Sequence, residues 1–224
     1  MPALSTVEAR SEGSVSGAGY GLLERGADWS EARGVLIAMH GRELEAALLP
    51  AQLAEIAARH RCRILAPIAP GLSWYPGRHD AGQGNEAGRE AALAEIDRLM
   101  ALANRQGFAD RRIVLVGFSQ GGCVVTEYLL WGSRRPGGAA IFTGCSLTVP
   151  AEPSGRCAGV SVVITSGEND PWLPLDDLFV AADALERAGA RVTREIFSGQ
   201  DHVVRPREME LLDELIEHLL AQEK

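Results

Sequence analysis

Short apolar runs alternate with longer amphipathic segments along most of this chain, and that alternation constrains its fold more than any other feature. The apolar runs have the length of buried strands, and helical patterns lie between them. Because neighbouring parallel strands need a crossover connection, which a helix supplies, we expect an α/β chain with a mostly parallel sheet and helices on both faces. The expected strands span 34–39, 63–66, 112–116, 139–143, 160–165 and 191–197.

The expected helices carry apolar residues at three- and four-residue steps. They cover 43–60, 93–103, 123–131, 176–189 and a last segment that Pro206 opens, because proline is tolerated at a first helical position. Residues 14–25 can add an edge strand, although three glycines weaken that interpretation. We expect residues 1–13 to be flexible and 14–224 to form one domain. No segment is long enough for a separate cap, but the irregular stretch 66–88 is a candidate pocket wall.

Composition excludes several classes of partner. The net charge of −8 disfavours nucleic acid and anionic membranes, and no apolar stretch approaches the roughly 20 residues of a membrane span. Because no targeting segment is apparent in the first 30 residues, we expect a cytoplasmic protein. We expect no cofactor, and a homodimer is one possible assembly. The four cysteines lack Cys-x-x-Cys spacing, and no histidine pair has metal-ligand spacing, so we expect reduced structural thiols and no metal.

The segment 117–122, Gly-Phe-Ser-Gln-Gly-Gly, follows one expected strand and precedes a helix. A serine in a Gly-x-Ser-x-Gly elbow needs small neighbours, because the backbone turn is strained and the strand and helix press close to it. The pattern therefore presents Ser119 above the sheet as a candidate nucleophile. The alternative interpretation is a glycine-rich turn before a packed helix.

A serine nucleophile needs a base, and the base needs a carboxylate, which follow the serine in the order acid, then histidine, in chains with such an elbow. Asp170 lies in the loop after the expected strand 160–165, where ligand sites of open α/β sheets form. Glu168 is the second choice for the acid. His202 follows the next strand and is the candidate base, with a surface or capping role as the alternative.

Acyl transfer also requires hydrogen-bond donors for the oxyanion that develops on the substrate. The residue after the nucleophile, Gln120, offers one backbone N–H. The sequence His40-Gly41-Arg42 follows the first expected strand of the parallel set, so the backbone N–H of Arg42 is the candidate second donor, and its side chain need not participate. Gly41 as a simple turn before a helix is the alternative.

Few aromatic residues occur in the chain, and three of them fall in loops expected at the carboxyl edge of the sheet. We expect Trp74, Tyr75 and Trp172, with the neighbouring Leu173, to bind substrate, although such aromatics can equally fill a gap over the core. Cys123, four residues after Ser119, is expected in the core and not as a nucleophile.

The sequence resembles the phospholipase/carboxylesterase family of α/β-hydrolases, which includes acyl-protein thioesterases. The resemblance rests on His40-Gly41, Trp74-Tyr75, the segment 117–122, the loop of Asp170 and His202. The resemblance covers most of the chain from about residue 34, and the segment 117–122 is its most specific part. It implies a single α/β-hydrolase domain with little or no cap and a catalytic triad of Ser119, Asp170 and His202. His-Gly-Arg at 40–42 and Trp-Tyr-Pro at 74–76 are closer to the bacterial carboxylesterase branch. Two segments near the expected pocket depart from that pattern: Glu-Leu-Glu at 43–45 and the polar, glycine-rich 77–88.

The function expected from these residues and this resemblance is hydrolysis of small or medium acyl esters through an acyl-enzyme on Ser119. An acyl thioesterase or a lysophospholipase of the same family is the alternative within enzymes. A hydrolase-fold protein that holds a small molecule without turning it over is the alternative of another class. Dienelactone hydrolases share the fold but usually carry cysteine at the elbow, so Ser119 counts against them.

Overall fold

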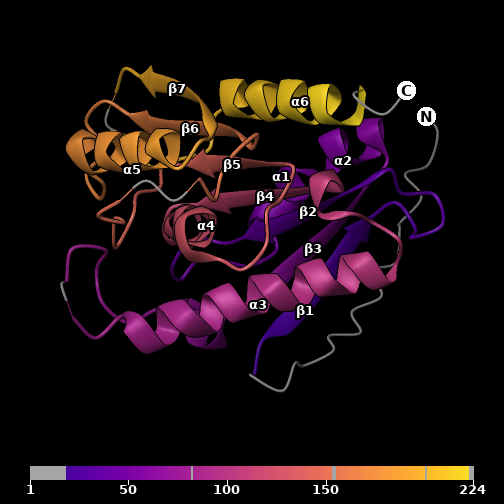
Figure 1. The fold of residues 1–224 in the computed structure, drawn as a ribbon, viewed down its shortest axis with the longest axis horizontal. Coiled ribbons are helices and arrows are strands. Elements are labelled where there is room, and N and C mark those ends of the chain that lie inside the picture. The colour runs from indigo at the N-terminus through magenta and orange to yellow at the C-terminus, as the bar shows by residue number, and fades with distance from the viewer. Residues whose placement is uncertain (1–18, 82, 153–154, 200, 222–224) are drawn as a thin grey trace, which may run out of the picture.

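The computed structural model describes residues 19–81, 83–152, 155–199 and 201–221 (Figure 1). Seven strands form one sheet in the order β1-β3-β2-β4-β5-β6-β7. β1 runs antiparallel to β3, and every other neighbouring pair is parallel, as the alternation predicts. The segment 1–13, expected to be flexible, lies outside the described residues. The strands are β1 Gly21–Gly26, β2 Gly34–Met39, β3 Cys62–Ile68, β4 Ile113–Phe118, β5 Gly138–Phe142, β6 Ser161–Gly167 and β7 Arg191–Phe197.

Helices cover both faces of the sheet and lie in most connections between parallel strands, whereas β5 is joined to β6 by a connection in which the described residues form no helix (Figure 1). The last helix begins at Pro206, at the first helical position that the sequence predicts for it. The edge strand expected within 14–25 is β1, displaced toward the end of that range. The helices are α1 Leu48–Gln52, α2 Ala54–His60, α3 Glu86–Arg105, α4 Gln120–Trp131, α5 Leu175–Arg187 and α6 Pro206–Ala221, with short 3-10 turns η1 Pro70–Leu72 and η2 Asp110–Arg112.

The single helix predicted over 43–60 is wrong in its first part. Glu43 has a φ of 55°, in the left-handed region, and its N–H donates to the carbonyl of Leu72 instead of entering a helix. Helix α1 therefore begins only at Leu48, and Leu53 separates it from α2. Of the residues that do not form a helix, Glu43 and Leu44 line the candidate site described below.

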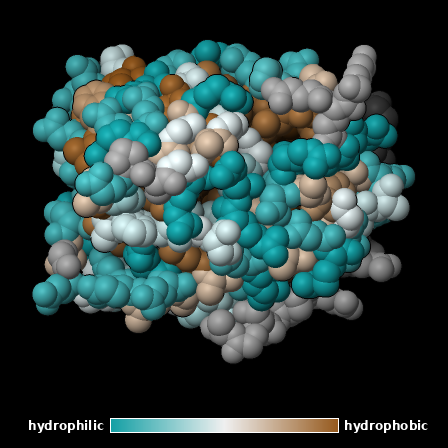
Figure 2. All heavy atoms as spheres, viewed as in Figure 1, coloured by the Kyte–Doolittle hydropathy of each residue, from teal (hydrophilic) through white to brown (hydrophobic). Residues whose placement is uncertain are grey.

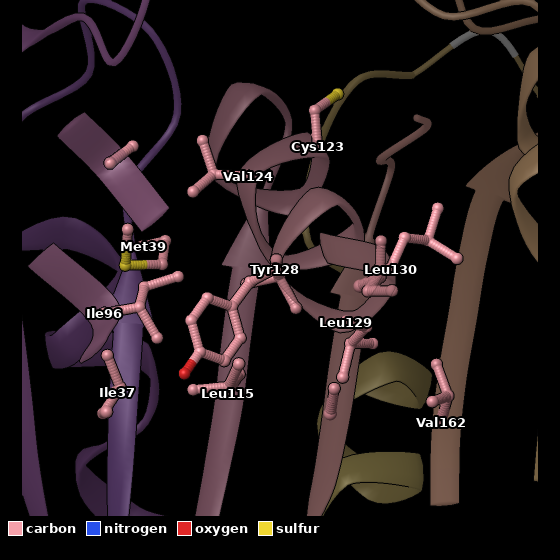
Figure 3. Packing of buried hydrophobic residues seen from close by; sticks show 14 of the residues in the cluster. Ile37, Met39, Ile96, Leu115, Cys123, Val124, Tyr128, Leu129, Leu130 and Val162 are labelled. Atoms are coloured by element: carbon pink, nitrogen blue, oxygen red, sulfur yellow. The ribbon is translucent and has the colours of Figure 1, made fainter. Parts of the chain in front are cut away.

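Two hydrophobic clusters, one on each face of the sheet, form the core. Successive residues of β2 alternate between them: Ile37 and Met39 belong to the cluster under α3, α4 and α5, whereas Leu36 and Ala38 belong to the cluster under α1, α2 and α6. Figure 3 shows the first cluster, in which Tyr128 of α4 packs among strand side chains. Because both faces of the central strands are covered, these strands read as continuous apolar runs in the sequence.

The surface seen in Figure 2 is largely hydrophilic, with smaller hydrophobic areas between the polar side chains. Among the helices of the described residues, none combines the length and the apolar character needed to cross a bilayer.

Candidate active site

Ser119 lies at the sharp turn between β4 and α4. Its φ of 54° and ψ of −121° are a strained conformation for a residue with a side chain. The glycines on both sides make the turn possible: a Cβ on Gly117 would lie 2.4 Å from the Gly121 carbonyl oxygen, and one on Gly121 would lie 2.1 Å from the Met39 carbonyl oxygen. The elbow that the sequence predicts is therefore present, and the strain is held by backbone packing on both sides.

Asp170 is in the loop after β6, with its carboxylate fully buried. Its Oδ1 accepts the backbone N–H groups of Trp172 at 2.8 Å and Leu173 at 3.0 Å. These two hydrogen bonds fix the orientation of the carboxylate and leave Oδ2 free to accept a hydrogen bond from another group. Glu168, the second choice for the acid, has an exposed side chain, and its backbone N–H donates to the Phe197 carbonyl.

His202 lies between the serine and this carboxylate. Its Nδ1 is 2.7 Å from Asp170 Oδ2, and its Nε2 is 2.8 Å from Ser119 Oγ. Because a carboxylate only accepts, Nδ1 carries the proton, and Nε2 is left to accept the serine hydroxyl. The ring packs against Phe118, with centroids 5.1 Å apart. The structure thus brings together three side chains that the sequence separates by up to 83 positions.

The turn at 40–42 lies directly against the serine. A Cβ on Gly41 would be in van der Waals contact with the Ser119 Cβ at 3.4 Å, but it would lie only 2.7 Å from Leu44 Cδ1, so a side chain there would displace Leu44. Gln120 is the first residue of α4, and the first N–H groups of a helix have no partner within it. The two backbone donors expected at Arg42 and Gln120 therefore belong to segments that border Ser119.

The side chain of Arg42 anchors the loop after β3, a role that no motif in the sequence indicates. Its guanidinium donates to the carbonyls of Pro76 at 2.9 Å, Tyr75 at 3.1 Å and Gly77, and lies 5.9 Å from the Tyr75 ring centroid. The Gln120 side chain holds the same segment through the Trp74 N–H at 3.0 Å and the Tyr75 carbonyl at 2.8 Å. The loop expected as a pocket wall is thus attached to the two segments of the proposed oxyanion donors.

The two aromatic residues of this loop have different environments. Trp74, expected to bind substrate, is only 2% exposed: it stacks on Tyr20 and donates its indole N–H to the His40 carbonyl at 2.7 Å. It therefore fills the core beneath the loop. The prediction that Trp74 binds substrate is wrong, because its ring does not line the cleft. Tyr75, the next residue, lines the cleft beside Ser119.

A cleft of about 430 Å³ opens over Ser119 and His202. Tyr75, Trp172 and Leu173 line it, as the sequence predicts, and Trp172 is 62% exposed at its rim. Leu44 and His202 also border a second cavity of about 200 Å³, whose other walls include Leu48, Leu49, Val203 and Val204. The site is therefore an open cleft with an apolar neighbouring cavity.

His79 and Asp177 form an unpredicted contact at the side of this cleft. His79 Nε2 lies 2.9 Å from Asp177 Oδ2, which connects the loop after β3 to the first turn of α5. The pair was not apparent in the sequence because the two residues are 98 positions apart and neither has a motif around it. Within the described residues, no group of three or more His, Cys, Asp or Glu side chains is arranged to hold a metal ion.

Comparisons with known proteins identify the family and the fold of this chain. The family model "Phospholipase/Carboxylesterase" matches residues 51–220. The phospholipase/carboxylesterase of Dyadobacter fermentans is 27% identical, with a TM-score of 0.78 over 94% of this chain and 100% of that one. The Bacillus cereus carboxylesterase is 24% identical, with a TM-score of 0.74 over 91% and 96%, and the Mesorhizobium loti carboxylesterase is 19% identical, with a TM-score of 0.68 over 88% and 94%. This chain belongs to the phospholipase/carboxylesterase family and has the α/β-hydrolase fold of its esterases.

Proposed function

We propose that this protein is a serine carboxylesterase that hydrolyses small or medium acyl esters through an acyl-enzyme on Ser119. The observation that carries the proposal is the hydrogen-bonded series from Asp170 Oδ2 to His202 Nδ1 at 2.7 Å and from His202 Nε2 to Ser119 Oγ at 2.8 Å. Nucleophile and base in hydrogen-bond contact, with the base oriented by a third group, is the arrangement of nucleophilic acyl transfer.

Each group of the series has one task in the reaction. His202 Nε2 takes the proton of Ser119 as Oγ attacks the ester carbonyl carbon, and the N–H groups of Arg42 and Gln120 donate to the oxyanion. The imidazolium then gives its proton to the departing alcohol, and a water molecule, deprotonated by the same ring, releases the acid. Asp170 holds the ring in the tautomer with its proton on Nδ1 and stabilises the imidazolium, because its Oδ2 faces that nitrogen.

The cleft supports an ester of modest size as the substrate. Its volume of about 430 Å³ lies in the usual range for small-molecule sites, and it is open at the rim. The adjoining cavity of about 200 Å³ has apolar walls at Leu48, Leu49 and Val203, which suit a short hydrocarbon group. The same cleft can admit a thioester or a lysophospholipid, so the substrate screen below includes them.

The test of the nucleophile is mass spectrometry of the intact protein after incubation with a fluorophosphonate. We expect one label on the wild type and none on Ser119→Ala, because the reagent reacts with an activated serine irrespective of the natural substrate. Ser133→Ala is the matched control and should label like the wild type, since the exposed Ser133 hydroxyl donates to Asp97 at 2.7 Å and does not line the cleft. A folded wild type that takes no label, or a Ser119→Ala protein that does, contradicts the proposal.

Turnover distinguishes an esterase from a protein that only binds a ligand. Aryl esters and thioesters of increasing acyl length should show steady hydrolysis that Ser119→Ala lowers by several orders of magnitude. A single burst without turnover, together with a tightly retained small molecule, would favour the binding protein. Faster turnover of thioesters or lysophospholipids than of simple esters would assign the alternative within the family.

A further inference from the structure

Two of the four free cysteines lie side by side, one at the floor of the cleft and the other buried behind it. The Sγ atoms of Cys123, on the first turn of α4, and Cys145, in the loop after β5, are 3.5 Å apart. Glycines let the two segments approach closely: a Cβ on Gly144 would lie 2.6 Å from the carbonyl carbon of Gly122. The pair has no counterpart in the sequence pattern, because 22 positions separate its members.

The surroundings of Cys123 favour a thiolate there. Its Sγ accepts the backbone N–H of Cys145 at 3.3 Å. Hydrogen bonding from the Cys145 thiol lowers the pKa of Cys123 despite the burial of that thiol, and the backbone N–H of Cys145 and the Tyr75 hydroxyl act in the same direction. Burial raises the pKa of Cys62 to about 12 and that of Cys157 to about 11. The hydrogen bond to Cys123 and burial raise the pKa of Cys145 well above its ordinary value, so Cys123 is the member of the pair that is favoured as a thiolate.

Cys123, although only 2% exposed, is the member of the pair that borders the cleft. It lines the same cleft as Ser119, whereas Cys145 is fully buried behind it. Figure 3 shows the Cys123 side chain at one end of α4, with its sulfur directed away from the Tyr128 ring that packs on the sheet. An oxidant entering the cleft therefore meets Cys123 first, with Cys145 in contact behind it.

We propose that Cys123 and Cys145 are a redox-active dithiol that a hydroperoxide converts to a disulfide. The Cys123 thiolate attacks the peroxide O–O bond, which forms a sulfenic acid and releases an alcohol, or water when the oxidant is hydrogen peroxide. The Cys145 sulfur then attacks the sulfenic sulfur and water leaves. In sum two thiols and one hydroperoxide give a disulfide, an alcohol and water, so two electrons pass from the sulfurs to the peroxide oxygens.

Closing this bond changes the cleft wall. The sulfurs must approach from 3.5 Å to about 2.05 Å, and the loop of Cys145 is held to α4 at its far end, because Glu127 accepts the N–H groups of Leu147 at 2.7 Å and Thr148 at 2.9 Å. The movement therefore falls on the first turn of α4 and on Cys123, whose thiolate the Tyr75 hydroxyl contacts. Ser119 immediately precedes that turn, so the oxidised site is displaced.

The experiment treats the purified full chain with hydrogen peroxide, alkylates it after denaturation, and maps the peptides by mass spectrometry. We expect the loss of two hydrogen atoms from the intact mass, a peptide pair joined through Cys123 and Cys145, and full alkylation of Cys62 and Cys157. Reduction should restore alkylation at all four. Cys157→Ser, the matched control, should still form the disulfide, and Cys145→Ser should not.

Two results overturn the proposal. One is a wild type in which all four cysteines remain alkylatable after peroxide, and the other is oxidation of Cys123 to the sulfinic acid with Cys145 still free. The mapping of the wild type requires no variant to fold. Ser119→Ala should form the same disulfide, because its hydroxyl takes no part, so this outcome is independent of the esterase proposal.

The effect on the cleft has a separate readout. The oxidised wild type should react with the fluorophosphonate roughly tenfold more slowly than the reduced protein, because small displacements of a site are costly. Reduction should restore the rate. Equal rates for the two forms contradict the coupling between the disulfide and the site.

Discussion

At the scale of single residues, the site depends on how hydrogen bonds orient one imidazole. Asp170 uses one oxygen for two backbone N–H groups of its own loop and presents the other to His202 Nδ1. An amide in its place has one oxygen to serve both tasks. The carboxylate is therefore needed to hold the His202 tautomer with its proton on Nδ1, as well as to supply a negative charge beside the ring.

Asp170→Asn is expected to lower kcat by about 10⁴-fold and to leave the fold intact, because the amide NH₂ would face Nδ1 and favour the wrong tautomer. Steady-state hydrolysis of an aryl ester checks this. Glu168→Gln, two residues away with an exposed side chain, is the matched control and should keep wild-type turnover. A comparable loss in both variants would contradict the assignment of the acid.

His40 is a second histidine held by specific contacts, in this case in the core. Its Nε2 accepts the Ala69 N–H at 3.1 Å, so its Nδ1 carries the proton that is donated to the Gly41 carbonyl at 2.7 Å. Burial lowers the pKa of His40 below its ordinary value of 6.5, with the Gly41 hydrogen bond acting in the opposite direction. The protein therefore holds this ring neutral.

A pH dependence of stability follows from that environment. Below about pH 6.5 the unfolded chain binds a proton at His40 that the folded protein resists, so the free energy of unfolding should fall as the pH drops from 7 to 5. Urea unfolding at several pH values measures this slope. His40→Gln should make the slope shallower, and an unchanged slope would show that other groups cause it.

At the scale of elements, one irregular segment forms a wall of the cleft beside Ser119. The loop between β3 and α3 forms little regular secondary structure. Side chains of other segments, chiefly Arg42 and Gln120, hold it in position through hydrogen bonds. Asn85 adds a local contact through the Gly77 N–H at 2.8 Å. The position of Tyr75 in the cleft is therefore set by residues far away in the sequence.

Arg42→Ala is expected to raise KM and to lower kcat/KM by roughly 10- to 100-fold, because charged hydrogen bonds to three carbonyls of the loop are lost while the backbone N–H at 42 remains. Arg42→Lys should recover little of this, since one ammonium cannot reproduce the planar guanidinium. Arg78→Ala, in the same cleft but with an exposed side chain bonded only locally to Asp80, is the control. A wild-type KM in Arg42→Ala would contradict the anchoring role.

Elements whose sequence signals lie within their own segment were predicted correctly, and those shaped by contacts with other segments were not. Strands β2 to β7 and helices α3 to α6 follow from periodicity within each segment, and the elbow follows from adjacent glycines. The helix over 43–60 was overpredicted because the positive φ of Glu43 and its hydrogen bond to Leu72 come from a contact with another loop. Trp74 and Tyr75 are neighbours of similar character, so no local rule separates the buried ring from the cleft ring.

At the scale of the whole molecule, two separate clusters on the faces of one sheet stabilise the fold. Leu99 of α3 and Leu212 of α6 are both fully buried, and they belong to different clusters. The sheet lies between them, so neither side chain shares packing partners with the other. Both clusters hold the carboxyl ends of the strands in register, where the candidate site forms.

Leu99→Ala and Leu212→Ala are each expected to lower the free energy of unfolding by about 2–5 kcal/mol. The double variant should show the sum to within about 0.5 kcal/mol, because distant sites without shared contacts act independently. Denaturant unfolding of the two single variants and the double variant measures this. A deviation well above that margin would mean that the two faces are coupled through the sheet.

The sequence by itself determined the order of strands and helices, the elbow at Ser119, and the two loops from which an acid and a base come. Each of these is written in a few neighbouring residues, since periodicity, proline and glycine act through local backbone geometry. Only the tertiary structure decided between Asp170 and Glu168 as the partner of His202, and only it placed Arg42 on the loop of Tyr75 and Cys123 on Cys145. Those contacts join segments from different strands, and their distances depend on how the whole sheet and its helices pack.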